Sequence, residues 1–157
     1  MENDTIHDEL CPTRQMNEPI VICDYSPLVF SQLFRLLSDV YDGKVTQEDL
    51  ELHYLGFDQQ IITAMQGESL LGCAFLDYKT DYIRNYRTVF VTYVAVDSKC
   101  RHQGIGSKLF DEIEKRARSR CCAAIELTSA DSRTAAHAFY HSLLFSKKKT
   151  TVFIKEL

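Results

Sequence analysis

The sequence predicts one α/β domain, an α+β mixed sheet flanked by helices, with elements in the order βααβββαβαβ. Three consecutive segments carry this prediction. Residues 89–96 are apolar apart from Thr92, which is typical of a strand buried on both faces. From Ile105 to Ala117, apolar residues recur every four positions among charged ones, the period of an amphipathic helix. The apolar run at 123–128 predicts another strand, which completes a βαβ crossover.

The segments before this crossover predict one strand and two helices. Residues 20–23 are a short β-prone run. Pro27 suits the first turn of a helix, whose broad apolar face we expect to end at Gly43. Thr46-x-x-Asp49 resembles a capping box in which aspartate replaces glutamate, so we expect a short second helix to begin there.

Two further strands and a last helix complete the predicted order. We expect strands at 60–65 and 70–77, joined by a tight turn that contains glycine. After the crossover, Asp131 or Ser132 can cap the last helix. The end of the chain is β-prone around residues 150–154, where one bent strand and two separate strands both remain open.

Composition excludes several classes of protein. The 157 residues are 45% hydrophobic and 25% charged, which is ordinary for a domain that buries a core. A formal net charge of -4 gives no basic footprint for nucleic acid. No apolar run approaches the length of a membrane span, and the first residues are acidic, unlike a signal peptide. We therefore expect a cytoplasmic protein with a mobile tail at 1–18 and one domain at 19–157.

The cysteines and histidines predict neither disulfides nor a metal site. The chain has six cysteines with no Cys-x-x-Cys pair, so we expect reduced thiols that mostly serve as small core residues. His137 and His141 lie four apart on one predicted helix face, a spacing that can bind metal. The glutamate and third ligand that such a site needs are missing, so we expect no metal.

The glycines between the buried strand and the following helix predict a phosphate site. Free backbone N–H groups point out of a helix N-terminus, and glycine lets an anion approach them closely. The dinucleotide fingerprint needs a third glycine where this chain has Leu109. The Walker pattern needs a Gly-Lys-Ser/Thr run with a glycine five residues before it, and Gly106-Ser107-Lys108 does not supply this.

The remaining pattern, Arg101-x-x-Gly104-x-Gly106, resembles the pyrophosphate-binding signature of the GNAT family, the GCN5-related N-acetyltransferases. The predicted element order is also similar to the GNAT fold, and the resemblance covers residues 20–157. It implies an α/β acyl-CoA N-acyltransferase fold in which the strand before the glycines holds acetyl-CoA as co-substrate.

A second motif near the end of the chain supports the same resemblance. The segment AAHAFYHSLLF resembles the family pattern Ala-x-x-Phe/Leu-Tyr-x-x-x-Gly-Phe, with Tyr140 in place and Leu144 where glycine is usual. Because that glycine ends a helix, a leucine there is expected to lengthen the helix or strain its cap. The surrounding run IELTSADSRTAAHAFY looks most like the bacterial aminoalkylphosphonate acetyltransferase branch.

The resemblance implies a set of cofactor contacts. Backbone N–H groups of the glycine loop would hold pyrophosphate while Arg101 adds charge, and the backbone of the strand would pair with the pantetheine arm. The N–H of Val94 would then face the thioester oxygen. The residues placed at the cofactor are Val94, Ala95, Val96, Arg101, His102, Gln103, Gly104, Ile105, Gly106 and Ser107.

Acetyl transfer to an amine needs an acid for the leaving thiolate and a base for the amine. By the resemblance Tyr140 is the acid, since a phenol with an ordinary pKa of about 10 is protonated at neutral pH. The positions where relatives often carry the base hold Thr92 and Phe90, which cannot accept a proton. The alternatives for the base are Asp77, Asp81, Glu126 and a water chain held by Thr92, and the base stays unassigned.

The predicted function is acetyl-CoA-dependent N-acetylation of a primary amine in a small metabolite. A protein lysine or N-terminal acetyltransferase and a non-catalytic acyl-CoA-binding module are the alternatives. Thr92, Arg84 and Arg87 are the candidate substrate contacts, because the two arginines can hold the acid group of an aminoalkyl acid or phosphonate. A polyamine is the second substrate class, no nucleic acid or membrane partner is expected, and a homodimer is left open.

Overall fold

The computed structural model of the chain describes residues 18–41, 44–53 and 56–157. The described chain forms two compact units, the first ending at Glu126 and the second spanning Leu127–Leu157. The predicted mobile tail falls on residues 1–18, of which the first seventeen lie outside the described residues, as does the predicted helix end at Gly43.

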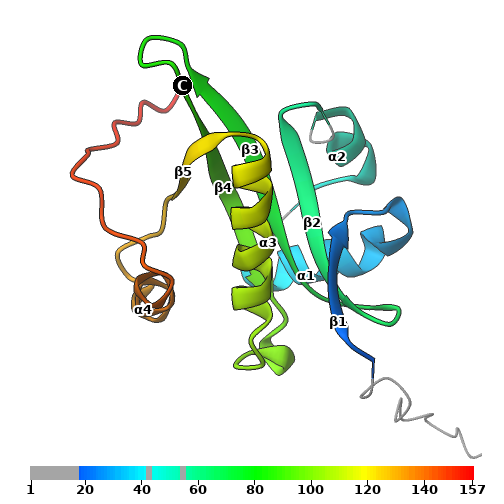
Figure 1. Cartoon of the computed structure of the whole chain (residues 1–157). Coiled ribbons are helices and arrows are strands. Elements are labelled where there is room, and N and C mark those ends of the chain that lie inside the picture. The colour runs from blue at the N-terminus through cyan, green and yellow to red at the C-terminus, as the bar shows by residue number, and fades with distance from the viewer. Residues whose placement is uncertain (1–17, 42–43, 54–55) are drawn as a thin grey trace, which may run out of the picture. The chain divides into compact units, whose positions relative to one another are not determined.

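The first unit is built on a five-stranded sheet with the strand order β1-β2-β3-β4-β5 (Figure 1). The first four strands pair antiparallel, and the crossover to the fifth makes the sheet mixed. This arrangement confirms the predicted fold class. The strands are β1 (Ile20–Asp24), β2 (Gln59–Gln66), β3 (Ser69–Asp81), β4 (Tyr86–Val96) and β5 (Cys122–Leu127).

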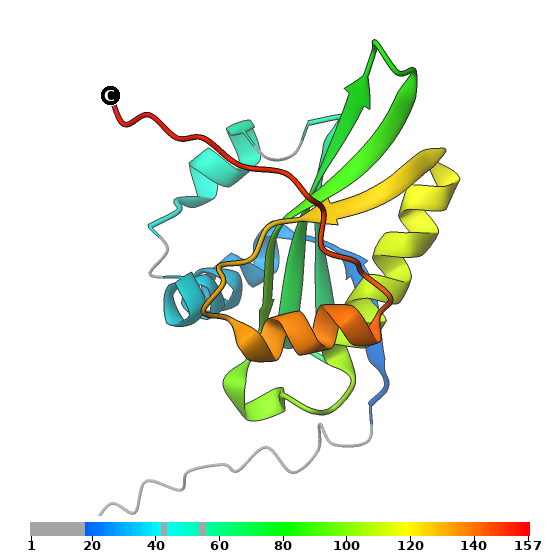
Figure 2. The same cartoon turned by 90° about the vertical axis from the view of Figure 1, so that its left-hand side faces the viewer.

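Helices cover both faces of this sheet (Figure 2). One face carries the 3-10 turn η2 (Pro27–Val29), α1 (Phe30–Tyr41) and α2 (Gln47–His53), and the other carries α3 (Ile105–Ser119). In the described part of the chain, no helix is both long and apolar enough to cross a membrane.

The core on the α1 side follows the strand alternation. Leu33 of α1 and Leu50 of α2 are fully buried against Phe75 of β3. The α2 N-terminus is capped as the sequence predicts, because the Thr46 hydroxyl accepts the N–H of Asp49 at 3.1 Å and donates to its carboxylate at 2.6 Å. Capping and apolar burial together fix where these two helices lie on the sheet.

On the opposite face, α3 approaches the sheet closely at Gly72. A Cβ built on Gly72 would lie 2.9 Å from the carbonyl oxygen of Ala95 and 3.2 Å from a methyl carbon of Ile105. Ile105 and Leu109 are fully buried there, so a glycine is what the close packing requires.

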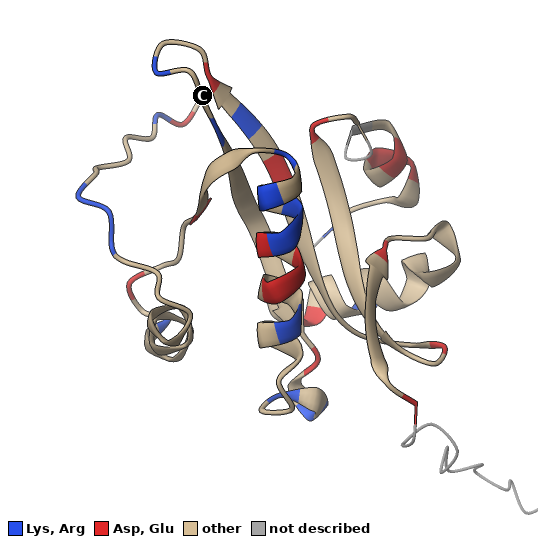
Figure 3. Ribbon diagram, viewed as in Figure 1, with Lys and Arg blue, Asp and Glu red and all other residues tan. Residues whose placement is uncertain are grey.

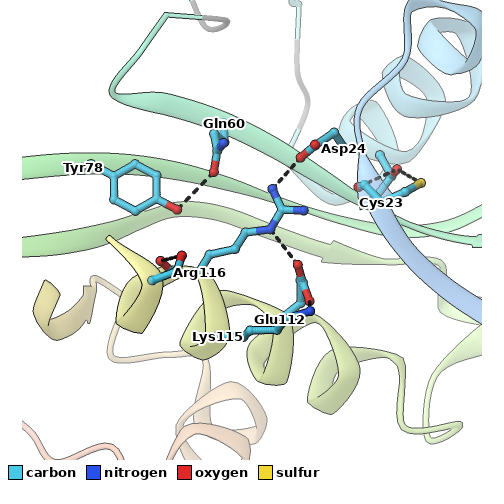
Figure 4. Close-up of polar contacts among 9 residues, drawn as sticks. Cys23, Asp24, Gln60, Tyr78, Glu112, Lys115 and Arg116 are labelled. Carbon is cyan, nitrogen blue, oxygen red and sulfur yellow. Dashed lines mark hydrogen bonds and ion pairs between the residues drawn. The ribbon is translucent and has the colours of Figure 1, made fainter. Parts of the chain in front are cut away.

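The other end of α3 is tied to the sheet by a polar network (Figure 4). Arg116 donates to Asp24 on β1 and to Glu112 one turn earlier on its own helix. The side chain of Arg116 is only 18% exposed, so this pair is less screened than the helix's surface ion pairs. Charges of both signs alternate over the rest of α3 (Figure 3), as expected for its solvent face.

The interpretation of the cysteines as mostly core residues is wrong. Among the five described cysteines only Cys73 is buried, and burial raises the pKa of its thiol to about 12. Cys23 is exposed on the edge strand β1, and Cys121 is exposed in the left-handed turn that follows α3, where its φ is 55°. All five are free thiols, as predicted.

The second unit contains α4 (Thr134–Ser142) and extended chain after it. Its N-cap is Arg133, without a side-chain hydrogen bond, so the predicted caps Asp131 and Ser132 are wrong. The predicted strand at 150–154 is not formed in the described residues. Three consecutive lysines precede this segment, and an isolated strand without a neighbour is unstable in water.

Leu144 explains how α4 ends. Its backbone is left-handed, with φ 65°, and its N–H donates to the carbonyl of His141 at 3.0 Å. The N–H of Phe145 donates to the carbonyl of Tyr140 at 3.0 Å, which completes a Schellman motif. Of the two expected consequences, the structure shows a strained cap rather than a longer helix.

The close approach at Gly72 generates the first testable prediction. Gly72→Ala should lower the free energy of unfolding by about 1–3 kcal/mol, because the new methyl group overlaps backbone that cannot rotate away. Urea denaturation followed by circular dichroism measures this. Ala74→Gly on the same strand face is the matched control for a glycine–alanine difference alone. A Gly72→Ala protein as stable as the wild type would contradict the packing argument.

The strained helix cap at Leu144 generates the second testable prediction. Leu144→Gly should raise the free energy of unfolding by about 1 kcal/mol, because glycine adopts positive φ without steric cost. The leucine side chain is 93% exposed, so little packing is lost. Leu144→Ala keeps the Cβ and is the control. If Leu144→Gly is no more stable than Leu144→Ala, the cap is not strained.

Candidate functional site

A loop of unusual backbone joins β4 to α3. It begins with the 3-10 turn η3 (Ser98–Cys100), which Asp97 caps by accepting the N–H of Lys99 at 2.9 Å. Two residues later His102 has φ 62°, and Gly104 has φ 75° as the N-cap of α3. Two left-handed residues within three positions turn the chain sharply, so α3 begins directly beside the end of β4.

The start of α3 leaves backbone donors available. Gly104 offers no side-chain cap, and the first turn of the helix holds no acidic residue. The first intrahelical bond runs from the N–H of Lys108 to the carbonyl of Gly104, so the preceding N–H groups need another acceptor. Residues 101–104 are exposed, and no heavy atom lies within 4 Å of a Cβ built on Gly104. This arrangement suits an anion with several oxygens.

The strand that leads into this loop is bulged. Phe75 of β3 is paired with Tyr93 of β4, but the next residue Leu76 is paired with Val91, so Thr92 is the extra residue of a β-bulge. The bulge bends β4 and places Thr92 and Tyr93 on the same face of the sheet. This is the face covered by α1, because Phe75 belongs to the core cluster on that side.

The backbone of Val94 follows the bulge and meets a tyrosine. The Tyr41 hydroxyl at the end of α1 donates to the carbonyl of Val94 at 2.7 Å and accepts its N–H at 3.3 Å. The Tyr41 ring also packs edge-on against Tyr93, with centroids 5.2 Å apart. The N–H that we expected to face a thioester is therefore bonded to the Tyr41 hydroxyl.

A carboxylate lies beside the bulge. The Thr92 hydroxyl donates to the carboxylate of Asp77 on β3 at 2.6 Å. Asp77 is paired with Phe90 and is partly exposed. Lys79, two residues along the same strand, covers the Phe90 ring with its ammonium 4.3 Å from the centroid. Asp77 and Thr92, two of the alternatives that the sequence left open for the general base, are thus hydrogen-bonded to each other.

The candidate substrate arginines lie elsewhere. Arg87 forms an ion pair with Asp58 and stacks over Tyr78, whose ring also contacts Arg120 at the end of α3. Arg87 therefore lies on the α3 face of the sheet, opposite Thr92. Arg84 is held by Asp81 in the hairpin turn at 3.0 Å. The structure does not bring these two arginines together with Thr92.

In the second unit, Tyr140 lies on α4 between two rings. Its ring centroid is 5.7 Å from that of Phe139 and 6.0 Å from that of Phe145. The Nδ1 atom of His141 lies 3.1 Å from the carbonyl oxygen of Phe145, at the C-terminus of the same helix. Among the described residues, no group of three or more metal-ligating side chains is assembled.

Tyr41 is the residue at this site that sequence reasoning missed. Its contact with Val94 spans 53 positions in the chain, and its place in an amphipathic helix predicts only a packing role. The hydrogen bond between Asp77 and Thr92 was also missed, because it depends on the register between β3 and β4, which no local sequence pattern gives.

Comparisons with known proteins agree with this geometry. The chain matches the model of the acetyltransferase (GNAT) family over residues 30–145. A search of curated proteins gives no match. Among solved structures, a transcriptional regulator from Bacillus halodurans C-125 is similar over 88% of this chain and 100% of its own, with a TM-score of 0.80 and 21% identity.

Two acetyltransferase structures are similar as well. The aminoglycoside acetyltransferase meta-AAC0020 from an uncultured soil metagenomic sample has a TM-score of 0.77 and 20% identity, over 88% of this chain and 95% of its own. Aminoglycoside N-acetyltransferase AAC(6')-Iy in complex with CoA has a TM-score of 0.78 and 15% identity over the same shares. At these identities the structures show the fold, while the family match spans most of the chain. The chain belongs to the GNAT family of acetyltransferases.

Proposed function

We propose that this chain transfers the acetyl group of acetyl-CoA to a primary amine of a small metabolite. The observation that carries the proposal is the loop after β4, with its left-handed Gly104 and the open N–H groups at the start of α3. The pyrophosphate of acetyl-CoA is the anion that this loop fits in a GNAT protein.

In this proposal the loop and β4 divide the binding of acetyl-CoA between them. The N–H groups of residues 103–107 hold the pyrophosphate, and Arg101 adds its charge. The backbone of Val94 and Val96 pairs with the pantetheine arm as an added strand would. The thioester oxygen takes the place of the Tyr41 hydroxyl as acceptor of the Val94 N–H, which stabilises the oxyanion formed during transfer.

Tyr140 is the proposed acid. As the C–S bond breaks, its phenol gives a proton to the departing thiolate. The support for this role is the match of Tyr140 to the family motif and its chemistry. Phe139 and Phe145 pack against its ring on either side.

The acceptor is proposed to be a small amine. Acidic residues dominate α2, where Glu48, Asp49 and Glu51 are exposed (Figure 3), and they favour a cationic molecule. Arg84 and Arg87 already hold carboxylates, so an anionic group on the substrate has to compete for them. An aminoalkyl acid or phosphonate and a polyamine remain the two substrate classes, and the two acetyltransferases above act on aminoglycosides.

A screen of amines tests the function. The full chain is incubated with acetyl-CoA and each of aminomethylphosphonate, spermidine, sisomicin and a lysine-containing peptide, and free thiol is followed. We expect amine-dependent thiol release with at least one small amine. Turnover of the peptide alone would favour a protein acetyltransferase, and acetyl-CoA binding without any turnover would identify an acyl-CoA-binding module.

The phosphate loop generates the third prediction. Gly104→Glu should abolish acetyl-CoA binding in a calorimetric titration, because a carboxylate would lie where the pyrophosphate is proposed to bind. Positive φ strains any residue here, so Gly104→Asn, which tolerates that conformation without charge, is the matched control. Equal affinity in a folded Gly104→Glu protein would refute the site.

The fourth prediction concerns the acid. Tyr140→Phe should lower kcat by roughly 10²–10⁴-fold while the KM for acetyl-CoA changes little, because only the proton donor is lost. Phe139→Leu, which removes a neighbouring ring and spares the phenol, is the control for packing. A fall in kcat of less than about threefold would leave Tyr140 as a packing residue.

A further inference from the structure

We propose that Asp77 is the general base that accepts the proton of the attacking amine. The inference rests on the proposed function, because it needs an amine and a thioester at β4. In this chain the β4 positions from which a side chain could act as base hold Thr92 and Phe90, neither of which titrates near neutral pH. The structure supplies the missing carboxylate from the neighbouring strand.

The sheet register places Asp77 beside the reacting strand. Asp77 is paired with Phe90, and its carboxylate reaches across to the hydroxyl of Thr92 at 2.6 Å. Thr92 is the bulge residue and stands two positions before Val94, whose N–H is the proposed thioester contact. A strand rises about 3.3 Å per residue, so a carboxylate held at Thr92 lies roughly 6–7 Å along the strand from that thioester, a gap that the attacking amine and one water can span.

Thr92 holds the carboxylate in position. Ordinary alternation puts Thr92, two residues after Phe90, on the same face as Asp77, and the bulge brings Tyr93 to that face as well. One carboxylate oxygen accepts the threonine hydroxyl, which leaves the other oxygen with lone pairs for an amine. Thr92 is therefore a positioning residue in this proposal.

The other candidate carboxylates are less well suited. Asp81 organises the β3–β4 turn by accepting the N–H groups of Ile83 and Arg84 and the Arg84 side chain. The backbone hydrogen bond from Arg84, with the other donors, lowers the pKa of that carboxyl. Glu126 lies on β5 at the boundary of the first unit, and it stays an alternative that the experiment below decides.

The proposed step balances without a further reactant. The neutral amine attacks the thioester carbonyl, so a C–N bond forms and the carbonyl electron pair moves to oxygen. The nitrogen loses one proton to the Asp77 carboxylate as this bond forms. When the oxyanion collapses, the C–S bond breaks and the thiolate takes a proton from Tyr140. Solvent carries the proton from Asp77 back to the phenolate, and amide and free thiol are the products.

The test compares Asp77→Asn with the wild-type full chain, using acetyl-CoA and the best amine from the screen. The asparagine keeps the size and an acceptor for Thr92, so the fold and the dissociation constant for acetyl-CoA should be unchanged. We expect kcat/KM for the amine to fall by roughly 10²–10³-fold. Formate added to Asp77→Ala should restore activity by about tenfold or more, because a free carboxylate can fill the space of the missing base.

Two further variants make the result specific. Thr92→Val should lose activity in part and Thr92→Ser should regain it, since only the hydroxyl positions the carboxylate. Glu114→Gln, an exposed carboxylate-to-amide change on α3, is the control and should behave as the wild type. An Asp77→Asn protein within about threefold of the wild type, or an equal loss in Asp81→Asn or Glu126→Gln alone, would overturn the assignment.

The outcome separates this inference from the proposed function. If the wild type acetylates an amine and Asp77→Asn does so equally well, only the base assignment fails. If the wild type binds acetyl-CoA but acetylates none of the four probes, the enzyme proposal and Asp77 as base are both overturned.

Discussion

The close approach of α3 to the sheet at Gly72 is the constraint on which the rest of the site depends. Gly72 is paired with Val96, the last residue of β4, so the helix packs where that strand ends. Because the first helical residue, Ile105, is fully buried there, the chain has only the short loop from Asp97 to Gly104 in which to reverse. The left-handed residues in that loop are the consequence, and the open N–H groups of the helix come to lie beside the strand.

The bulge in β4 influences which side chains lie on each face of the sheet. It brings Tyr93 to the face covered by α1, where Thr92, Asp77 and the Tyr41 hydroxyl also lie. A separate stack on the α3 face consists of Tyr78, labelled in Figure 4, with Arg87 and Arg120 over its ring. These cation–π contacts stabilise the outer end of the sheet. The proposed base and the structural ion pairs thus lie on opposite faces of the same two strands.

Much of this architecture could be predicted from the sequence, since hydrophobic periodicity and glycine placement report local structure directly. The βαβ crossover, the cap at Thr46 and the glycine loop follow from residues close together in the chain. What could not be predicted depends on register and on distant contacts. The bulge at Thr92, the contact of Tyr41 with Val94 and the pairing of Arg87 with Asp58 each need a neighbour that no local pattern names. The prediction of a strand at 150–154 was wrong for the opposite reason. Its β propensity is a local property, whereas a stable strand needs a neighbouring strand to pair with.

Hydrogen–deuterium exchange of the full chain, with and without saturating acetyl-CoA, is the measurement that tests the central claim most directly. If acetyl-CoA lies along β4 with its pyrophosphate at the start of α3, exchange should slow in residues 94–107 and stay unchanged in the exposed turn at 82–85. Protection confined to other segments, or no protection at 94–107 under conditions where calorimetry detects binding, would contradict the account.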